Sequence, residues 1–216
     1  MTTFIFTLGF HEDHIVRRLH QSSATIDDEI LVFTAKPAQG AVKRAYEGLI
    51  GYTRSVRLRY PKLVEVPLES TPEALKIIIE ALGDKQEPFI VDLSGGMRAI
   101  GILVLTALLI MKVKADIYIQ PEAGEVNEVK IPKELFEYLE KPLTIEEQNI
   151  LREIVMNPGI TIEELATKQR KSPRTIRNTL TRLRKLLIIQ KGRKAGLYPT
   201  KWTQIITPQL HKQQKQ

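Results

Sequence analysis

The stretch Phe89-Ile-Val-Asp92-Leu-Ser94-Gly95-Gly96-Met97-Arg98 decides the fold of this chain. An apolar run leads into a polar Gly-Gly turn and then into the largely apolar residues 99–113, which predicts a strand, a tight turn and a helix. Such a turn gathers backbone N–H groups at a helix N-terminus, where an anion is stabilised. Arg98 adds a guanidinium suited to phosphate, and Ser94 can cap the helix or bind an oxygen. Because any strand-to-helix turn favours Gly and Ser, a purely structural turn stays open as well.

Segments of strand and helix character alternate on both sides of this stretch. The expected strands are residues 4–9, 29–35, 63–67, 89–93 and 115–119, and residues 125–131 are expected to form a hairpin with the last of them. The expected helices before the stretch cover residues 14–21, about 38–56, and a segment up to residue 82 that the capping box Ser70-Thr-Pro72-Glu73 opens. This alternation predicts an α/β fold with a mostly parallel sheet covered on both faces.

A second loop, Gly9-Phe10-His11-Glu12, follows the first strand and is expected at the same sheet edge as the Ser-Gly-Gly turn. Ligands of open α/β sheets bind beyond the carboxyl ends of the strands. The loop lacks the second and third glycines of G-x-G-x-x-G, and G-x-x-x-x-G-K-[ST] occurs nowhere, so an NAD site and a P-loop are disfavoured. The consecutive residues 11–14, His-Glu-Asp-His, cannot converge on one ion, so we expect no metal site.

Charge divides the chain into two parts. Residues 142–216 contain 15 Lys and Arg against 5 Asp and Glu, a net charge of +10. Residues 1–141 contain 17 against 20, a net charge of −3. This asymmetry suggests that the C-terminal part meets a polyanion, while the N-terminal part is an ordinary globular domain.

The cellular setting follows from what the sequence lacks. No cysteine is present, which excludes disulfides and thiolate metal sites. The N-terminus has no basic region of the kind found in signal peptides, and the longest apolar run, residues 99–111, is too short to span a bilayer. We therefore expect a cytoplasmic protein without membrane contact.

A proline-bounded segment, residues 131–142, separates the two parts and predicts a short connecting helix. Beyond it, Thr144-Ile-Glu-Glu147 and Thr161-Ile-Glu-Glu164 are capping boxes that each open a helix. Ser172-Pro173 predicts an N-cap and a first-turn proline for a third helix, which reaches about residue 186. Three helices in this order predict a helix-turn-helix domain.

The third helix has two contrasting faces. Its core stripe, at the spacing i, i+4, i+7 and i+11, consists of Ile176, Leu180, Leu183 and Leu187. The opposite side has no acidic residue and carries Arg174, Asn178, Thr181 and Lys185, with Arg177 and Arg182 on the flanks. Exposed helices usually mix both signs of charge, so we favour a DNA-recognition helix over a merely solvated basic face. In such a helix Arg and Asn reach base edges, and other cations contact phosphates.

The residues after this helix predict a wing. Residues 187–191 and 197–200 flank Gly192-Arg193-Lys194-Ala195-Gly196, which is typical of a hairpin with a basic tip. Trp202 is expected to pack the wing onto the helices, and residues 208–216 to form a flexible tail. Duplex DNA is therefore the expected partner, and the predicted contacts are Ser172, Arg174, Arg177, Asn178, Thr181, Arg182, Lys185, Arg193 and Lys194.

An α/β domain with Thr7-Leu-Gly-Phe10 after its first strand and Ser94-Gly-Gly-Met-Arg98 after its fourth, followed by a winged helix, resembles the CRISPR-associated transcription regulators with an N-terminal CARF domain. The resemblance covers the whole chain. It implies a Rossmann-like sensing and dimerisation domain (1–131), a connector (132–142), a winged helix-turn-helix DNA-binding domain (143–207) and a tail (208–216). It also implies a homodimer whose paired sheet edges bind a cyclic oligoadenylate, typically cyclic tetra-adenylate, through Leu8, Gly9, Phe10, Ser94, Gly95, Gly96, Met97 and Arg98.

The resemblance implies a regulator that binds the promoter or operator DNA of CRISPR-associated genes or arrays and responds to its cyclic ligand. It implies no cofactor and no catalytic residue. One alternative is a ring nuclease, because some CARF proteins cleave the ring with lysine and hydroxyl side chains, and Lys36 is the nearest candidate lysine beside Ser94. The other alternative is a regulator that senses a different nucleotide or metabolite.

Overall fold

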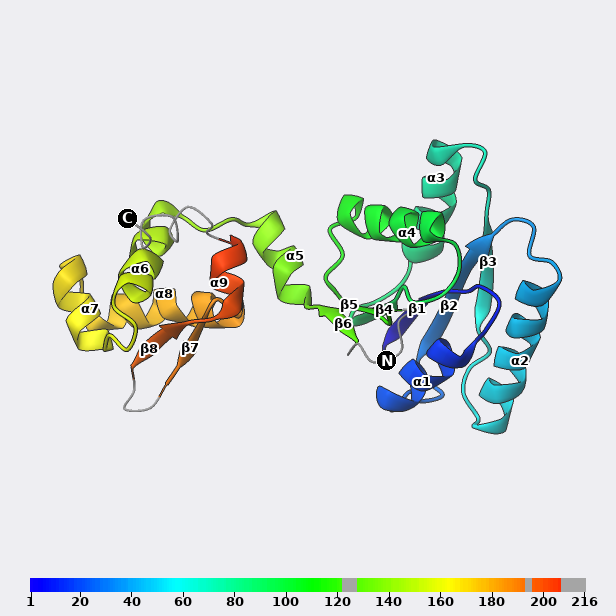
Figure 1. Ribbon diagram of the computed structural model, residues 1–216, viewed down its shortest axis with the longest axis horizontal. Coiled ribbons are helices and arrows are strands. Elements are labelled where there is room, and N and C mark those ends of the chain that lie inside the picture. The colour runs from blue at the N-terminus through cyan, green and yellow to red at the C-terminus, as the bar shows by residue number, and fades with distance from the viewer. Residues whose placement is uncertain (122–127, 193–195, 207–216) are drawn as a thin grey trace. The chain divides into compact units, whose positions relative to one another are not determined.

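The computed structural model of the protein describes residues 1–121, 128–192 and 196–206 (Figure 1). The chain divides into two compact units, Met1–Phe136 and Glu137–Gln216. The division falls inside helix α5 (Lys133–Glu140), which lies within the predicted connector. Phe136 packs into the core of the first unit, and Tyr138 packs against the core of the second. Within the described residues, no helix is both long and apolar enough to cross a membrane.

The first unit is built on a six-stranded sheet in the order β3-β2-β1-β4-β5-β6. Five strands pair in parallel: β1 (Thr3–Thr7), β2 (Glu29–Ala35), β3 (Lys62–Val66), β4 (Phe89–Asp92) and β5 (Ala115–Ile119). The sixth, β6 (Val129–Ile131), runs antiparallel to β5, as the predicted hairpin requires. The strand order reverses between β1 and β4, so the loops after these two strands flank the switch point of the sheet, where ligands of such folds bind.

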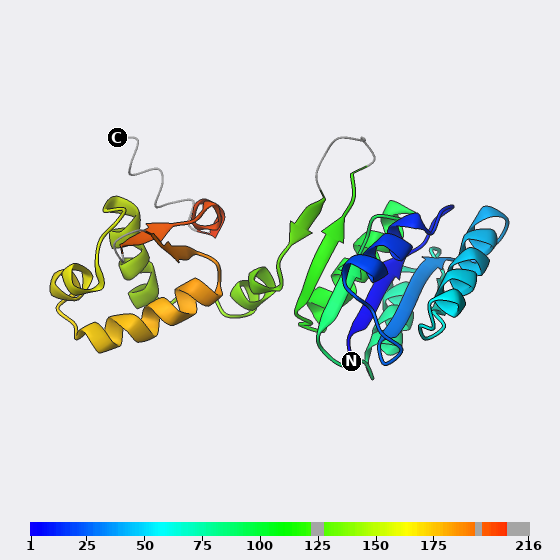
Figure 2. The same cartoon turned by 90° about the horizontal axis from the view of Figure 1, so that it is seen from below.

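Helices cover both faces of this sheet (Figures 1 and 2). The helices α1 (Asp13–Gln21) and α2 (Ala41–Ser55) pack on the face that carries Phe4 and Phe6. The helices α3 (Thr71–Leu82) and α4 (Arg98–Ile110) pack on the face that carries Ile5. Successive side chains of a strand point to opposite faces, so the continuous apolar run of β1 fills both cores. The predicted α/β fold with a mostly parallel sheet is confirmed.

Two details at the helix starts differ from the prediction. The predicted capping box at Ser70 is wrong, because α3 has Ser70 as its N-cap but the serine side chain accepts no bond from the first turn. Pro72 does lie in the first turn of α3, as predicted. The second helix begins at Ala41 rather than near residue 38, after Gly40 with its positive φ of 56°.

After the end of α5, the described part of the second unit consists of three helices, a two-stranded antiparallel hairpin and a short last helix. These elements are α6 (Ile145–Met156), α7 (Ile162–Gln169), α8 (Pro173–Lys185), β7 (Ile189–Lys191), β8 (Leu197–Pro199) and α9 (Lys201–Ile206). Both predicted capping boxes are present, at Thr144 with Glu147 and at Thr161 with Glu164. The Ser172 side chain caps α8 by accepting a bond from the Thr175 backbone N–H at 3.1 Å.

The core stripe of α8 is shorter than predicted. Ile176, Leu180 and Leu183 are fully buried, but Leu187 is 39% exposed, so its predicted place in the core is wrong. The helix ends at Lys185, and Leu187 has the left-handed φ of 57°, which takes its side chain off the helical periodicity. Leu186 and Ile188 are buried in its place.

Candidate functional site

The loops after β1 and β4 enclose a cavity of about 480 Å³ at the switch point of the sheet. Seven of the eight predicted ligand residues line it: Leu8, Gly9, Phe10, Ser94, Gly95, Gly96 and Met97. Arg98 is not among the lining residues and is instead exposed at the first position of α4. The rest of the lining, which is not among the predicted ligand residues, consists of His11, His14, Thr34, Ala35, Pro37 and Val42. His11 belongs to the loop after β1 and His14 to α1, just beyond it, whereas the other four residues come from β2, the segment after β2 and the start of α2, more than 20 residues from either loop.

Glycines hold the two loops in backbone contact. A Cβ atom on Gly9 would lie 2.8 Å from the backbone nitrogen of Gly96, and a Cβ on Gly96 would lie 2.8 Å from the carbonyl oxygen of Leu8. Real Cβ atoms essentially never approach this closely, so neither residue can carry a side chain without moving a loop. Gly96 also has a φ of +77°, which L side chains rarely adopt. The cavity floor is therefore made of peptide groups that a ligand can reach directly.

Ser94 does not cap α4, as the sequence analysis allowed, because its hydroxyl is bonded elsewhere. The Ser94 Oγ donates to Asp92 Oδ1 and accepts a 2.8 Å bond from the Gln120 backbone N–H. The Ser94 N–H donates to the same Asp92 oxygen at 3.0 Å. These bonds tie the turn after β4 to the end of β5. Among the described side chains none caps the first turn of α4, whose N-cap is Met97, so the N–H groups that precede the bond from Ile100 N–H to the Met97 carbonyl oxygen can bind an anion.

A buried arginine, Arg18, bonds the Asp92 carboxylate that holds the Ser94 turn. Arg18 of α1 is 5% exposed, and its Nε donates to Asp92 Oδ2 at 3.2 Å. The guanidinium also pairs with Glu128 and lies 3.7 Å from the centre of the Tyr118 ring. A buried carboxylate needs such a partner, and Asp92 is only 2% exposed. The conformation of the Ser94 turn thus depends on α1, β4 and β5 together.

The lining of the cavity contains exposed apolar side chains and few ionisable ones. Phe10 is 70% exposed and Met97 is 55% exposed, although both are apolar. Two histidines line the cavity, and His14 Nε2 lies 3.0 Å from the Thr7 carbonyl oxygen. Lys36, which the ring-nuclease alternative requires, is exposed and is not a lining residue. Peptide N–H groups and exposed apolar side chains suit a ligand that carries both phosphates and aromatic bases.

In the second unit, most predicted DNA contacts lie on the exposed side of α8. Arg177 pairs with Glu163 at 3.4 Å, and Lys185 pairs with Glu137 at 3.1 Å. Ion pairs between exposed side chains contribute little free energy, so these cations can exchange partners. The exposed set is Ser172, Arg174, Arg177, Asn178, Thr181 and Lys185. Arg193 and Lys194 of the predicted wing tip fall outside the described residues.

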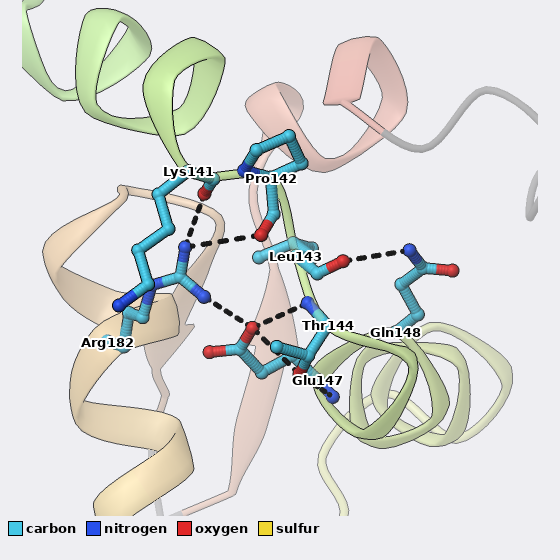
Figure 3. Close-up of polar contacts among 7 residues, drawn as sticks. All are labelled: Lys141, Pro142, Leu143, Thr144, Glu147, Gln148 and Arg182. Carbon is cyan, nitrogen blue, oxygen red and sulfur yellow. Dashed lines mark hydrogen bonds and ion pairs between the residues drawn. The ribbon is translucent and has the colours of Figure 1, made fainter.

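Arg182 differs from the other predicted DNA contacts (Figure 3). Its Nη1 pairs with Glu147, and its Nη2 donates to the carbonyl oxygens of Lys141 and Pro142. Its side chain is 20% exposed, so the structure directs it into the unit rather than toward the open side of α8. The helix periodicity places Arg182 on the flank correctly, but it cannot show that a carboxylate 35 residues away meets it there.

Comparison with known proteins identifies the family of the first unit. Residues 2–132 match the Csa3 CRISPR-associated Rossmann-like domain. The chain belongs to this family. The match contains the whole six-stranded sheet and both cavity loops, so the Csa3-family domain is the part that holds the cavity.

One relative covers most of the chain. It is Csa3 of Saccharolobus solfataricus, a CRISPR locus-related protein that is thought to bind DNA. It is 26% identical over 194 residues, which are 89% of this chain and 82% of the relative.

Solved structures are more distant. Protein VC1899 from Vibrio cholerae is 11% identical with a TM-score of 0.44, and the match covers 92% of this Csa3-family chain and 61% of that protein. Can2 from Sulfobacillus thermosulfidooxidans, solved with cyclic tetra-adenylate, is 13% identical with a TM-score of 0.43. The match covers 99% of this Csa3-family chain and 66% of Can2. The Csa3-family chain thus spans less than two thirds of the length of either structure.

Proposed function

We propose that this Csa3-family protein is a CRISPR-associated transcription regulator whose first unit binds a cyclic oligoadenylate and whose second unit binds promoter DNA. The observation that carries the proposal is the glycine contact between the loops after β1 and β4 beside the uncapped start of α4. It brings the peptide groups of both loops together beside a helix N-terminus, an arrangement that favours a phosphate. Phe10 and Met97 are exposed apolar groups on which bases can pack. Cyclic tetra-adenylate is the ligand we favour, because its ring of phosphates has a two-fold axis that a homodimer can match.

Binding rather than cleavage is the activity we propose. Cleavage by a lysine beside the scissile phosphate would need Lys36, which does not line the cavity. The Ser94 hydroxyl is already engaged by Asp92 and Gln120. Slow appearance of linear products from cyclic tetra-adenylate, lost in Ser94→Ala, would instead favour the ring-nuclease alternative.

The second unit is proposed to be a winged helix that reads duplex DNA with α8. A helix that follows a short helix and a turn, with a hairpin after it, has the element order of winged helix-turn-helix domains. The exposed side of α8 carries Arg and Asn, the residues that bind guanine and adenine edges in the major groove. The relative in Saccharolobus solfataricus is thought to bind DNA, which supports this assignment.

We expect the two proposed base-reading residues to behave differently from the wing cations. Arg174→Ala and Asn178→Ala should each relax sequence preference at a cost of about 1 to 3 kcal/mol, because a base contact is lost. Lys194→Ala should weaken binding to all duplexes alike and reduce the salt dependence, because a phosphate contact releases a counterion. Fluorescence anisotropy against a selected duplex and a random duplex at several salt concentrations measures both effects. Equal losses of affinity on both duplexes for Arg174→Ala and Asn178→Ala would refute the recognition-helix assignment.

Coupling between the two units is the direct test of the proposed regulation. A ligand can shift DNA affinity only if it binds two conformations unequally, and the effect is then reciprocal in free energy. We expect saturating cyclic tetra-adenylate to change the affinity for the selected duplex by about 5- to 150-fold, the range typical of allosteric coupling. Titrations of DNA with and without the ligand measure this change, and linear tetra-adenylate is the control. If the DNA titration curves with and without the ligand superimpose, the protein binds DNA constitutively and the proposed coupling is refuted.

A further inference from the structure

The start of the second unit is bonded to α8 by one arginine. Arg182 lies in the last part of α8 and uses both terminal nitrogens of its guanidinium inside the unit (Figure 3). One nitrogen pairs with Glu147 at the start of α6, and the other donates to the carbonyl oxygens of Lys141 and Pro142, at the end of the connector. The fork of the guanidinium therefore joins α8 to the stretch from the end of the connector to the start of α6, which is 35 to 41 residues away in sequence.

The Glu147 end of this contact is largely buried and strongly held. Glu147 is 7% exposed and also accepts bonds from the Thr144 N–H at 2.8 Å and the Thr144 Oγ1 at 3.0 Å. Burial raises the pKa of Glu147, but the bonds from Thr144 and Arg182 outweigh this effect and leave the pKa below its ordinary value. The carboxylate is therefore charged at neutral pH, and a charge with so little exposure requires its arginine partner.

Further bonds fix the same stretch of chain to the second unit. The Gln148 side chain donates to the Leu143 carbonyl oxygen at 3.0 Å, and Lys185 of α8 pairs with Glu137 of α5 at 3.1 Å. The Lys185 pair is solvent-exposed and contributes little free energy, whereas the pair between Arg182 and Glu147 is part-buried. Arg182 is thus the main polar link between α8 and the connector.

We infer that Arg182 is a positioning residue for DNA recognition and not a DNA contact. It fixes the orientation of α8 against the end of the connector, through which the chain passes from the first unit to the second. Three of the five N–H donors of this guanidinium bond a carboxylate and two carbonyl oxygens, and its charge is already paired with Glu147, so a phosphate would have to compete with these partners. This inference rests on the proposed binding of DNA by α8.

The test compares Arg182→Gln with Glu147→Gln in the full chain, using the duplex that the wild-type protein selects from a random pool. Glutamine at position 147 keeps the capping box, because its amide oxygen can still accept from Thr144, but it removes the charge that holds Arg182. We expect each variant to weaken binding by about tenfold, with little further loss in the double variant, because both lose the ion pair between Arg182 and Glu147. The slope of affinity against salt should stay that of the wild type, and Arg182→Lys should restore only part of the affinity, because an ammonium cannot span all three acceptors.

A DNA contact at Arg182 predicts the opposite pattern. Arg182→Gln would then reduce the salt slope by about one, Arg182→Lys would bind nearly as well as wild type, and Glu147→Gln would bind equally or more tightly because it frees a cation. Any of these results overturns the inference. Circular dichroism at the assay temperature identifies a variant that has failed to fold, and the other glutamine variant then decides. Failure of the wild-type protein to select any duplex would refute the proposed function itself.

Discussion

Gly96→Ala is expected to abolish tight binding of cyclic tetra-adenylate. The new methyl group would lie 2.8 Å from the Leu8 carbonyl oxygen, at a residue whose φ of +77° favours glycine. The two loops must then move apart, so the N–H groups on the cavity floor no longer converge on one phosphate. Two hydrogen bonds to charged phosphate, at about 1.5 kcal/mol or more each, correspond to about a 100-fold loss of affinity. The strained backbone should also lower the free energy of unfolding by about 1 to 3 kcal/mol.

Gly101→Ala is the matched control for this experiment. Gly101 lies in α4, five residues further along, and a Cβ there would meet only the Leu93 Cβ at 3.9 Å, an ordinary contact. We expect this variant to bind like wild type and to gain up to about 1 kcal/mol of stability, because alanine favours a helix interior. Isothermal titration calorimetry gives the affinities and thermal unfolding gives the stabilities. A folded Gly96→Ala protein with wild-type ligand affinity would show that the ligand does not use this floor.

Ile102→Glu is expected to convert the proposed homodimer into a monomer. The outer side of α4 is apolar, with Ile102 64% exposed and Leu109 and Ile110 exposed beside it at helical spacing. A helix that is apolar on all sides is normally covered on all sides, and the stripe begins one turn after the cavity loop. We propose that a second copy of the chain covers it, which would place two cavities near one two-fold axis. A buried glutamate without a partner costs several kcal/mol, enough to dissociate most dimers at micromolar concentration.

The monomer should remain folded, because Ile102 is exposed in the single chain. We also expect it to bind cyclic tetra-adenylate at least about tenfold more weakly, a loss of about 1.4 kcal/mol, since each protomer would supply half of the contacts. Sedimentation velocity measures the oligomeric state. Val56→Glu, at another exposed apolar residue of the first unit outside α4, is the control and should leave it unchanged. A wild-type monomer, or an Ile102→Glu protein that stays dimeric, would contradict the proposed interface.

The sequence by itself determined the α/β fold, the succession of strands and helices along the chain, and the two loops of the cavity. These features depend on signals between neighbouring residues, such as the apolar runs of β1 and β4 and the capping boxes at Thr144 and Thr161. The placement of the Gly9 loop and the Gly95-Gly96 turn at one edge of the sheet could also be predicted. Parallel strands end at the same edge of a sheet, so residues that follow them lie at that edge whatever the sequence distance between them.

Only the tertiary structure decided what the polar side chains bind. Ser94 bonds Asp92 and Gln120 rather than the start of α4, because β5 brings the Gln120 N–H beside it. Arg182 pairs with Glu147 across 35 residues and turns into the second unit, although the helix periodicity alone favours a DNA contact. Periodicity fixes the face on which a side chain lies, but its partner depends on which distant segment packs there. Long-range packing sets that choice, and no local pattern of residues encodes it.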